Sequence, residues 1–168
     1  ISQFEKRPKF TMLDTMNFWM DNTLDNLLKI ISKVDLICIN DEEVIQLSGC
    51  KDYKNGIKKI LTMGPKYLIM KKGEYGSTLY SNNLEFFCPS FKVKKVIDPT
   101  GAGDSFAGAF AGHLAESKNY TFESISSALI YANAVASFCV EKFGIENMLN
   151  ISKDEIDKRI SFIKKHNN

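Results

Sequence analysis

The sequence lacks the patterns that mark several classes of protein. No apolar run approaches the roughly 20 residues that a membrane-spanning helix needs. No signal-peptide pattern stands at the start of the chain. The net charge is only +2, which is too small to indicate a surface for nucleic acid. These absences favour a cytoplasmic globular protein that binds neither membranes nor nucleic acid.

Cysteine and histidine are too few and too scattered to predict a zinc site. None of the four cysteines forms a C-x-x-C pair, and the two histidines lie far apart in the sequence. Cys38 and Cys139 stand in apolar stretches and are expected to be buried as small hydrophobic side chains. A reducing compartment is the simplest setting for such thiols.

Two common nucleotide-binding patterns are also missing. The P-loop pattern is absent, and the dinucleotide pattern G-x-G-x-x-G fails because Phe106 occupies its last glycine position. There are no internal repeats and no low-complexity linkers. With 168 residues, 44% of them hydrophobic, the chain is long enough for one domain with a buried core.

Short apolar runs alternate with segments of helical periodicity, which predicts an α/β fold with a mainly parallel sheet. Polar or glycine-rich residues follow the strand ends, and ligands bind at that edge of a parallel sheet. Phe18 and Trp19 are expected in the core. Strands are expected at residues 10–13, 36–39, 67–70, 77–80, 84–87 and 93–97, and helices near 24–34, 44–47, 57–63, 105–116, 121–142 and 153–165.

The segment from Asp98 to Gly108 carries the clearest chemical pattern. A predicted strand runs into a glycine-rich turn and then into a helix rich in alanine and glycine. Glycines allow amide groups to turn toward a ligand, and a helix N-terminus favours an anion. An acid at an anion-binding place, here Asp104, is unusual because like charges repel, so it calls for a functional explanation. Phosphoryl transfer supplies one, because the attacking hydroxyl needs a base and the phosphoryl oxygens need oriented donors.

The stretch Asp98-Pro99-Thr100-Gly101-Ala102-Gly103-Asp104 resembles the second signature of the ribokinase-like (phosphofructokinase B) carbohydrate kinases, and the resemblance extends from Asp14 to about Phe143. It implies a three-layer α/β fold with a mainly parallel central sheet. It also implies that Asp104 is the catalytic base, and that Thr100 lies at the nucleotide. The amides of Gly101, Ala102 and Gly103 would form the anion hole for the γ-phosphate. The alternative is a glycine turn with a helix-capping aspartate.

Further residues are assigned by the same resemblance. Asn40-Asp41-Glu42-Glu43 is similar to the family's N-x-x-E motif, so Asn40 and Glu43 would organise Mg²⁺ and phosphate through water. Magnesium prefers oxygen ligands and keeps several waters, which suits this pair. The alternative for Glu43 is an exposed acid near a helix N-terminus.

The stretch from Lys71 to Gly76 resembles the strand and turn that border ATP in the family. Gly73 and Gly76 would allow the backbone to approach the phosphates, and Lys71, preferred over Lys72, would pair with a phosphate oxygen. Asn133 stands in an Ala-Asn-Ala run similar to one near the nucleotide in the family. A helix-packing asparagine is the alternative there.

Asp98 resembles a carboxylate near the monovalent-cation site of some members, which makes K⁺ a candidate activator beside Mg²⁺. Pro99 replaces the threonine often found there, so the cation ligands stay open. Asp14 ends the first predicted strand, at an edge that faces the acceptor in relatives. A strand-end turn is the equal alternative.

Complete relatives are about twice as long, and their Gly-Gly sugar signature and β lid have no counterpart in this sequence. Residues 1–168 are therefore expected to be the carboxy-terminal, ATP-binding and catalytic part of such a kinase domain, with the amino-terminal half and lid missing. The implied function is transfer of the γ-phosphoryl group of ATP to a sugar hydroxyl. Lid-mediated dimers are common among relatives, so a homodimer is a candidate assembly of the full-length protein. The alternatives are a nucleoside kinase and a non-catalytic nucleotide-binding fragment.

Overall fold

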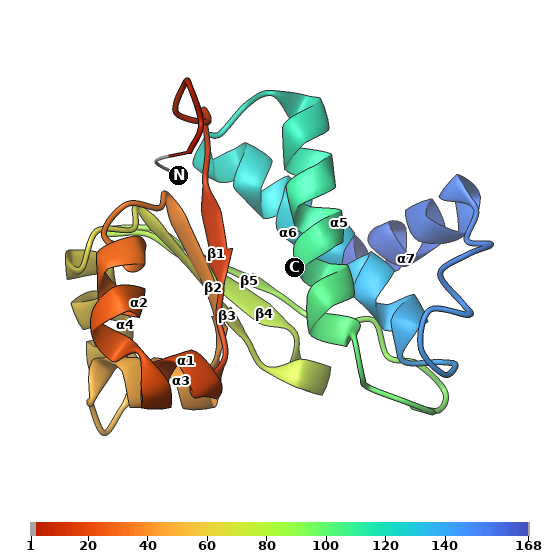
Figure 1. The fold of residues 1–168 in the computed structure, drawn as a ribbon. Coiled ribbons are helices and arrows are strands. Elements are labelled where there is room, and N and C mark those ends of the chain that lie inside the picture. The colour runs from red at the N-terminus through yellow and green to blue at the C-terminus, as the bar shows by residue number, and fades with distance from the viewer. Residues whose placement is uncertain (1–2, 168) are drawn as a thin grey trace. The chain divides into compact units, whose positions relative to one another are not determined.

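The computed structural model describes residues 3–167, which form an α/β fold (Figure 1). Within these residues, five strands form one sheet in the order β1-β2-β3-β4-β5, and β1, β2 and β3 pair in parallel. The strands are β1 (Met12–Asp14), β2 (Leu36–Asn40), β3 (Tyr67–Lys71), β4 (Ser77–Tyr80) and β5 (Glu85–Cys88). The helices are α1 (Asn17–Asn22), α2 (Leu24–Ile31), α3 (Asp41–Ser48), α4 (Tyr53–Thr62), η1 (Gly73–Tyr75), α5 (Ala102–Ser117), α6 (Phe122–Cys139) and α7 (Lys153–Lys165).

The chain divides into two compact units. Within the described residues, the first contains residues 3–71 and 79–85, and the second contains residues 72–78 and 86–167. No helix within residues 3–167 has both the length and the hydropathy needed to cross a bilayer. The four cysteines are free, and Cys38 and Cys139 are buried as the sequence predicts.

In the first unit, helices α1 to α4 lie beside strands β1 to β3 (Figure 1). One core cluster contains alternate residues of two strands together with Ile31 and other helix residues. The strand residues are Ile37 and Ile39 of β2 and Leu68 and Met70 of β3. This alternation follows from the two-residue period of a strand, which sends successive side chains to opposite faces. The parallel register then brings the carboxyl ends of β2 and β3 together, with Asn40 paired to Lys71.

In the second unit, α5 and α6 pack side by side (Figure 1). Phe106, Phe110 and Leu114 recur four residues apart on α5 and are all buried, which is the spacing of one helical face. His113, also on α5, stacks on Tyr131 of α6 with ring centroids 4.6 Å apart. Helix α7 contacts α6, so α6 is covered from more than one side.

Two local predictions are wrong, and one helix was not predicted. Residues 93–97 form no strand, because the amide of Ile97 donates to the carbonyl of Val140 at 2.8 Å and not to a neighbouring strand. Phe18 and Trp19 are 53% and 47% exposed, so they are not core residues; their rings contact each other edge to face. They lie on α1, a helix that the sequence did not predict.

Candidate functional site

The predicted site residues fall into two groups, one in each unit. Asn40, Glu43 and Lys71 lie in the first unit, at the carboxyl ends of parallel strands or in the helix that follows. The others lie in the second unit, in the turn after β3, in the glycine loop and its helix, and in α6: Gly73, Gly76, Asp98, Thr100, Gly101, Ala102, Gly103, Asp104 and Asn133.

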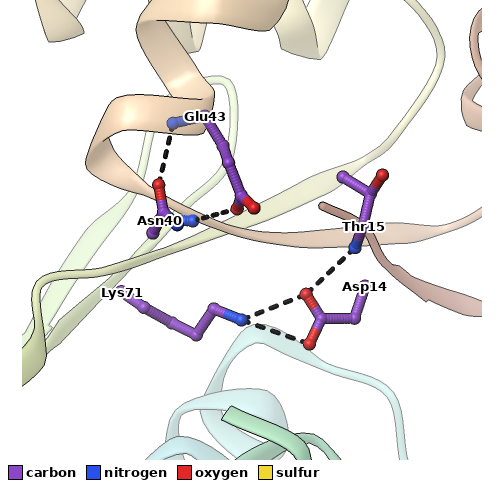
Figure 2. Close-up of polar contacts among 5 residues, drawn as sticks. All are labelled: Asp14, Thr15, Asn40, Glu43 and Lys71. Carbon is purple, nitrogen blue, oxygen red and sulfur yellow. Dashed lines mark hydrogen bonds and ion pairs between the residues drawn. The ribbon is translucent and has the colours of Figure 1, made fainter. Parts of the chain in front are cut away.

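Lys71 is held by Asp14, the last residue of β1. Its Nζ lies 3.0 Å from Oδ1 and 3.1 Å from Oδ2 of that carboxylate, and Figure 2 shows the ammonium group between them. Oδ1 of Asp14 also accepts a hydrogen bond from the amide of Thr15 at 3.0 Å. The Lys71 and Asp14 side chains are 21% and 27% exposed, so water screens the pair only in part. Lys71 therefore has an anionic partner within the protein, and Asp14 does more than end a strand.

Asn40 and Glu43 form a capping box at the start of α3 (Figure 2). Oδ1 of Asn40 accepts from the amide of Glu43 at 2.8 Å, and Oε2 of Glu43 accepts from the amide of Asn40 at 2.7 Å. Two helix-terminal amides are thereby satisfied. Glu43 is only 5% exposed, so the alternative of an exposed helix acid is wrong. A carboxylate has about four acceptor positions, so one hydrogen bond leaves capacity for a water on Mg²⁺.

The charges of this group affect one another. Burial raises the pKa of Glu43, and the Asn40 amide and Lys71 offset part of the rise. Burial by itself would lower the pKa of Lys71, but the pKa is raised overall, and the carboxylates of Asp14 and Glu43 contribute to the rise. Burial also raises the pKa of the Cys38 thiol to about 12, so Cys38 is a neutral thiol beside this group. The lysine is thus kept charged where an anion could use it.

In the second unit, the glycine loop is braced at its first residue. Oδ1 of Asp98 accepts from the amide of Thr100 at 3.0 Å, and hydrogen bonds from Thr100 and from the Gly144 amide hold the pKa of Asp98 below its usual value. The carbonyl of Thr100 faces Sγ of Cys139 at 3.6 Å. Asp98 therefore shapes the loop through backbone amides. Among residues 3–167, no group of three or more His, Cys, Asp and Glu could hold a metal ion.

Gly101 ends this loop with φ of 80°, a backbone conformation that favours glycine, and α5 begins directly after it. Helices α3, α4, α6 and α7 each have a side chain that accepts from an amide of their first turn, but α5 has none. Ala102 donates to the carbonyl of Pro99 at 3.2 Å. Within the described residues, the amides of Gly103 and Asp104 have no such hydrogen bond. The start of α5 therefore offers free donors to an anion.

Asp104 lies in the first turn of α5 and is exposed. Its carboxylate does not enter the core, and no hydrogen bond to it is found within the described residues. An aspartate that capped its own helix would accept from a first-turn amide, as Asp52 does from the amide of Asn55 at 2.9 Å. The alternative of a helix-capping aspartate is therefore wrong for Asp104.

A cleft of about 600 Å³ lies within the second unit, a size in the range of small-molecule sites. Gly73, Ala102 and Asn133 line it, so three of the predicted site residues meet there. Its other walls are mostly apolar and were missed by the sequence reasoning. They come from the irregular segment after β5 and from α6 with its C-cap residue, and include Phe91, Val93, Val96, Ala136 and Val140. The small residues around Asn133 were the one sequence signal for this wall.

The turn at one side of the cleft is tight. The amide of Gly76 donates to the carbonyl of Gly73 at 3.1 Å, and the amide of Lys72 donates to the carbonyl of Gly76 at 2.8 Å. Gly76 has φ of 99°, and a Cβ there would lie 2.2 Å from the carbonyl oxygen of Cys88. Gly73 has φ of 51° and open space at its Cβ position. Gly76 is thus required by backbone packing, whereas Gly73 leaves room beside the cleft.

Asn133 packs α6 against a neighbouring strand and also lines the cleft. It is 8% exposed, and its Nδ2 donates to Oγ of Ser77 at 2.7 Å and to the carbonyl of Leu129 at 2.9 Å. These bonds tie α6 to the start of β4. The same residue lines the cleft, so Asn133 joins helix packing to the cleft wall.

The sequence matches the pattern of the family described as pfkB family carbohydrate kinase over residues 5–151. It is similar to a cytidine kinase of Thermococcus kodakarensis, with 33% identity over 87 residues that cover 51% of this chain and 31% of the relative. It is also similar to a ribokinase of Staphylococcus aureus, with 28% identity over 151 residues, or 87% of this chain and 47% of that protein.

The fold matches a solved structure of an E. coli protein assigned as ribokinase II, in complex with ATP and Mg²⁺. The TM-score is 0.73 and the sequence identity is 28%, over 94% of this chain and 49% of that one. The expected ribokinase-like α/β fold is confirmed. The chain spans between 31% and 47% of the length of the first curated relatives it matches.

Proposed function

This chain belongs to the pfkB family of carbohydrate kinases, and we propose that the protein transfers the γ-phosphoryl group of ATP to a hydroxyl of a sugar. One observation carries the proposal. The exposed Asp104 stands in the first turn of a helix whose amides at Gly103 and Asp104 make no hydrogen bond within residues 3–167. A base and a set of anion donors therefore occur within one helical turn.

In this mechanism, Asp104 takes the proton of the attacking hydroxyl as its oxygen approaches the γ-phosphorus. The amide of Ala102, which the sequence assigned to the anion hole, already donates to the carbonyl of Pro99. The amides of Gly103 and Asp104 would instead face the oxygens of the migrating group, where charge concentrates during transfer. These donors are fixed by the loop and need no rearrangement. Asp98 supports this role by holding the Thr100 amide, which keeps the preceding turn in shape.

The cleft of the second unit is proposed as the nucleotide site. Its apolar walls suit a purine, and Gly73 gives open space where backbone could face phosphate. A solved relative binds ATP and Mg²⁺, which supports the same cofactors here. Magnesium would neutralise phosphate charge, and Asn40 and Glu43 would hold it through water. Lys71 would supply a positive charge to phosphate, and a phosphate oxygen would then compete with Asp14 for its ammonium group.

A nucleoside kinase is the second candidate, and it is favoured by the 33% identity to a cytidine kinase. The two candidates share the base and the donors and differ only in the acceptor. A non-catalytic nucleotide-binding protein is the third, but the free, exposed carboxylate of Asp104 argues against it. Activation by K⁺ near Asp98, a homodimer and a cytoplasmic location stay predictions of the same proposal.

The test is ADP release by the intact protein with ATP and a panel of sugars and nucleosides. Asp104→Asn should lower kcat by about 10³-fold, within the range for loss of a general base, and should leave ATP affinity within about twofold. Asp154→Asn is the matched control, since Asp154 is an exposed acid in the first turn of α7. Near-normal turnover by Asp104→Asn would contradict the mechanism, and turnover with nucleosides alone would select the second candidate.

A further inference from the structure

One wall of the cleft has no regular secondary structure of its own. Residues 89–99 form neither strand nor helix, yet Phe91, Val93 and Val96 from this segment line the cleft. A wall built from such a segment keeps its shape only if other elements hold it. Phe91 contacts residues of α7, and this helix lies outside residues 5–151, which match the family pattern.

Two residues of α7 hold the ring of Phe91. The guanidinium carbon of Arg159 lies 4.4 Å from the centroid of that ring. The ring of Phe162 meets it edge to face, with centroids 5.1 Å apart. Arg159 and Phe162 are three positions apart, so they share one face of the helix. The Phe91 ring is thereby clamped by one charged and one aromatic neighbour.

Arg159 also binds two groups of α6 and its end. Its Nη1 donates to Oγ of Ser137 at 2.7 Å, and Ser137 is itself a cleft residue. Its Nη2 pairs with Oε2 of Glu141 at 2.5 Å. The guanidinium carbon also lies 3.4 Å from the ring centroid of Phe138. The Arg159 side chain is only 12% exposed, so little water competes for these contacts.

The position of Glu141 extends this network to the glycine loop. Glu141 follows Val140, whose carbonyl accepts from the amides of Ile97 at 2.8 Å and Asp98 at 3.3 Å. A shift at the end of α6 would therefore move both the cleft wall and the start of the loop. Arg159 thus contacts Phe91 of the cleft wall, Ser137 of α6, and Glu141, which is next to Val140.

The choice of arginine at position 159 indicates that the side chain orients its neighbours and does not only supply a positive charge. Of the 22 basic residues, only Arg7 and Arg159 are arginines, and all others are lysines. A lysine would supply charge at position 159, but it has no planar group to stack between two rings while it binds two separate acceptors. The arginine thus fits a position where orientation matters.

We propose that Arg159 is a positioning residue of the nucleotide cleft: it fixes Phe91 and Ser137 and so sets the affinity for ATP. The inference rests on the proposed function, because it assumes that the cleft receives the nucleotide. Arg159 does not line the cleft, so it acts only through its neighbours.

The experiment compares Arg159→Lys with the wild type in the intact protein. Titration with a fluorescent ATP analogue gives the dissociation constant, steady-state kinetics gives KM for ATP and kcat, and urea unfolding gives stability. Arg159→Lys should weaken nucleotide binding and raise KM for ATP by about tenfold, with kcat changed by less than about twofold, because stacking is lost and charge is kept. Arg159→Met should weaken binding further. Lys158→Ala, an exposed neighbour on α7, is the control and should match the wild type.

The results separate this inference from the proposed function. If the wild type binds the analogue and Arg159→Lys binds it equally well, Arg159 is only structural and the inference is overturned. A fall in stability with unchanged KM for ATP would have the same meaning. If the wild type itself binds no nucleotide, the proposed function fails, and this inference fails with it.

Discussion

Asn40 and Glu43 each use a side-chain oxygen to bind the other's amide, at 2.8 Å and 2.7 Å, so the two residues of the expected magnesium motif are also the cap of α3. A structural role and the proposed chemical role thus fall on the same side chains. Variants must therefore be chosen so that the two roles can be measured separately.

Asn40→Ala should lower the free energy of unfolding by about 1 kcal/mol, since an N-cap lost to alanine costs about that much. Asn40→Ser is the matched control, because serine accepts the same hydrogen bond, and its stability should stay close to that of the wild type. If Asn40 also organises Mg²⁺, Asn40→Ser should still need several-fold more Mg²⁺ for half-maximal activity. Urea unfolding and a Mg²⁺ titration measure the two effects. Equal Mg²⁺ requirements would contradict the metal role.

Glu43→Gln tests the burial of a carboxylate. The pKa of Glu43 is raised above 4.5, so the folded state binds its proton more tightly than the unfolded state does. The stability contributed by this group is therefore fully present below pH 4.5 and is lost as pH rises through the folded pKa. Glutamine keeps an acceptor for the Asn40 amide and does not ionise.

The variant should accordingly gain stability relative to the wild type between acid and neutral pH, as measured by urea unfolding at several pH values. A difference that stays constant with pH would show that Glu43 titrates normally. The same variant should bind Mg²⁺–ATP more weakly, because a neutral amide attracts the cation's water shell less than a carboxylate does.

Asp14 and Lys71 can be tested with a double-mutant cycle. Asp14→Asn and Lys71→Met should each destabilise the protein by about 1 kcal/mol, because each leaves a partly buried charge without its partner. The double variant should lose less than the sum, with a coupling energy of at least about 0.5 kcal/mol. Urea unfolding of the four proteins gives the value. A coupling near zero would mean that the 3.0 Å ion pair contributes nothing measurable to stability.

Gly76→Ala should be strongly destabilising, by more than about 2 kcal/mol, since the new Cβ would meet backbone atoms that cannot move aside. Those atoms are the carbonyl oxygen of Cys88 at 2.2 Å and the amide nitrogen of Ser90 at 2.8 Å. Gly73→Ala is the matched control in the same turn. It should cost only about 1 kcal/mol, because its φ is also positive but its Cβ position is open. Thermal unfolding of both variants would contradict this account if the two midpoints fell equally.

The Asp104 loop shows how far sequence reasoning reached into the site. The turn at Gly101, the helix that follows it and the acid at Asp104 could all be predicted from the sequence, because turn formation and helix initiation depend on residues a few positions apart. The free amides of α5 were an inference that only the hydrogen bonds could support. The cleft walls were missed, since Phe91 and Val140 are 49 positions apart by their numbers and no local pattern links them.

The four strands β2 to β5 and helix α7 follow from the sequence itself, because their apolar periods and caps are properties of neighbouring residues. Residues 93–97 have the same apolar character, but they bond to the end of α6, and Phe18 and Trp19 are exposed despite their size. Whether such a segment forms a strand, and whether such a side chain is buried, depends on which distant part of the chain packs against it. Local chemistry therefore determined the elements and the glycine loop, whereas tertiary structure decided the ion pair of Asp14 with Lys71, the burial of Glu43 and the walls of the cleft.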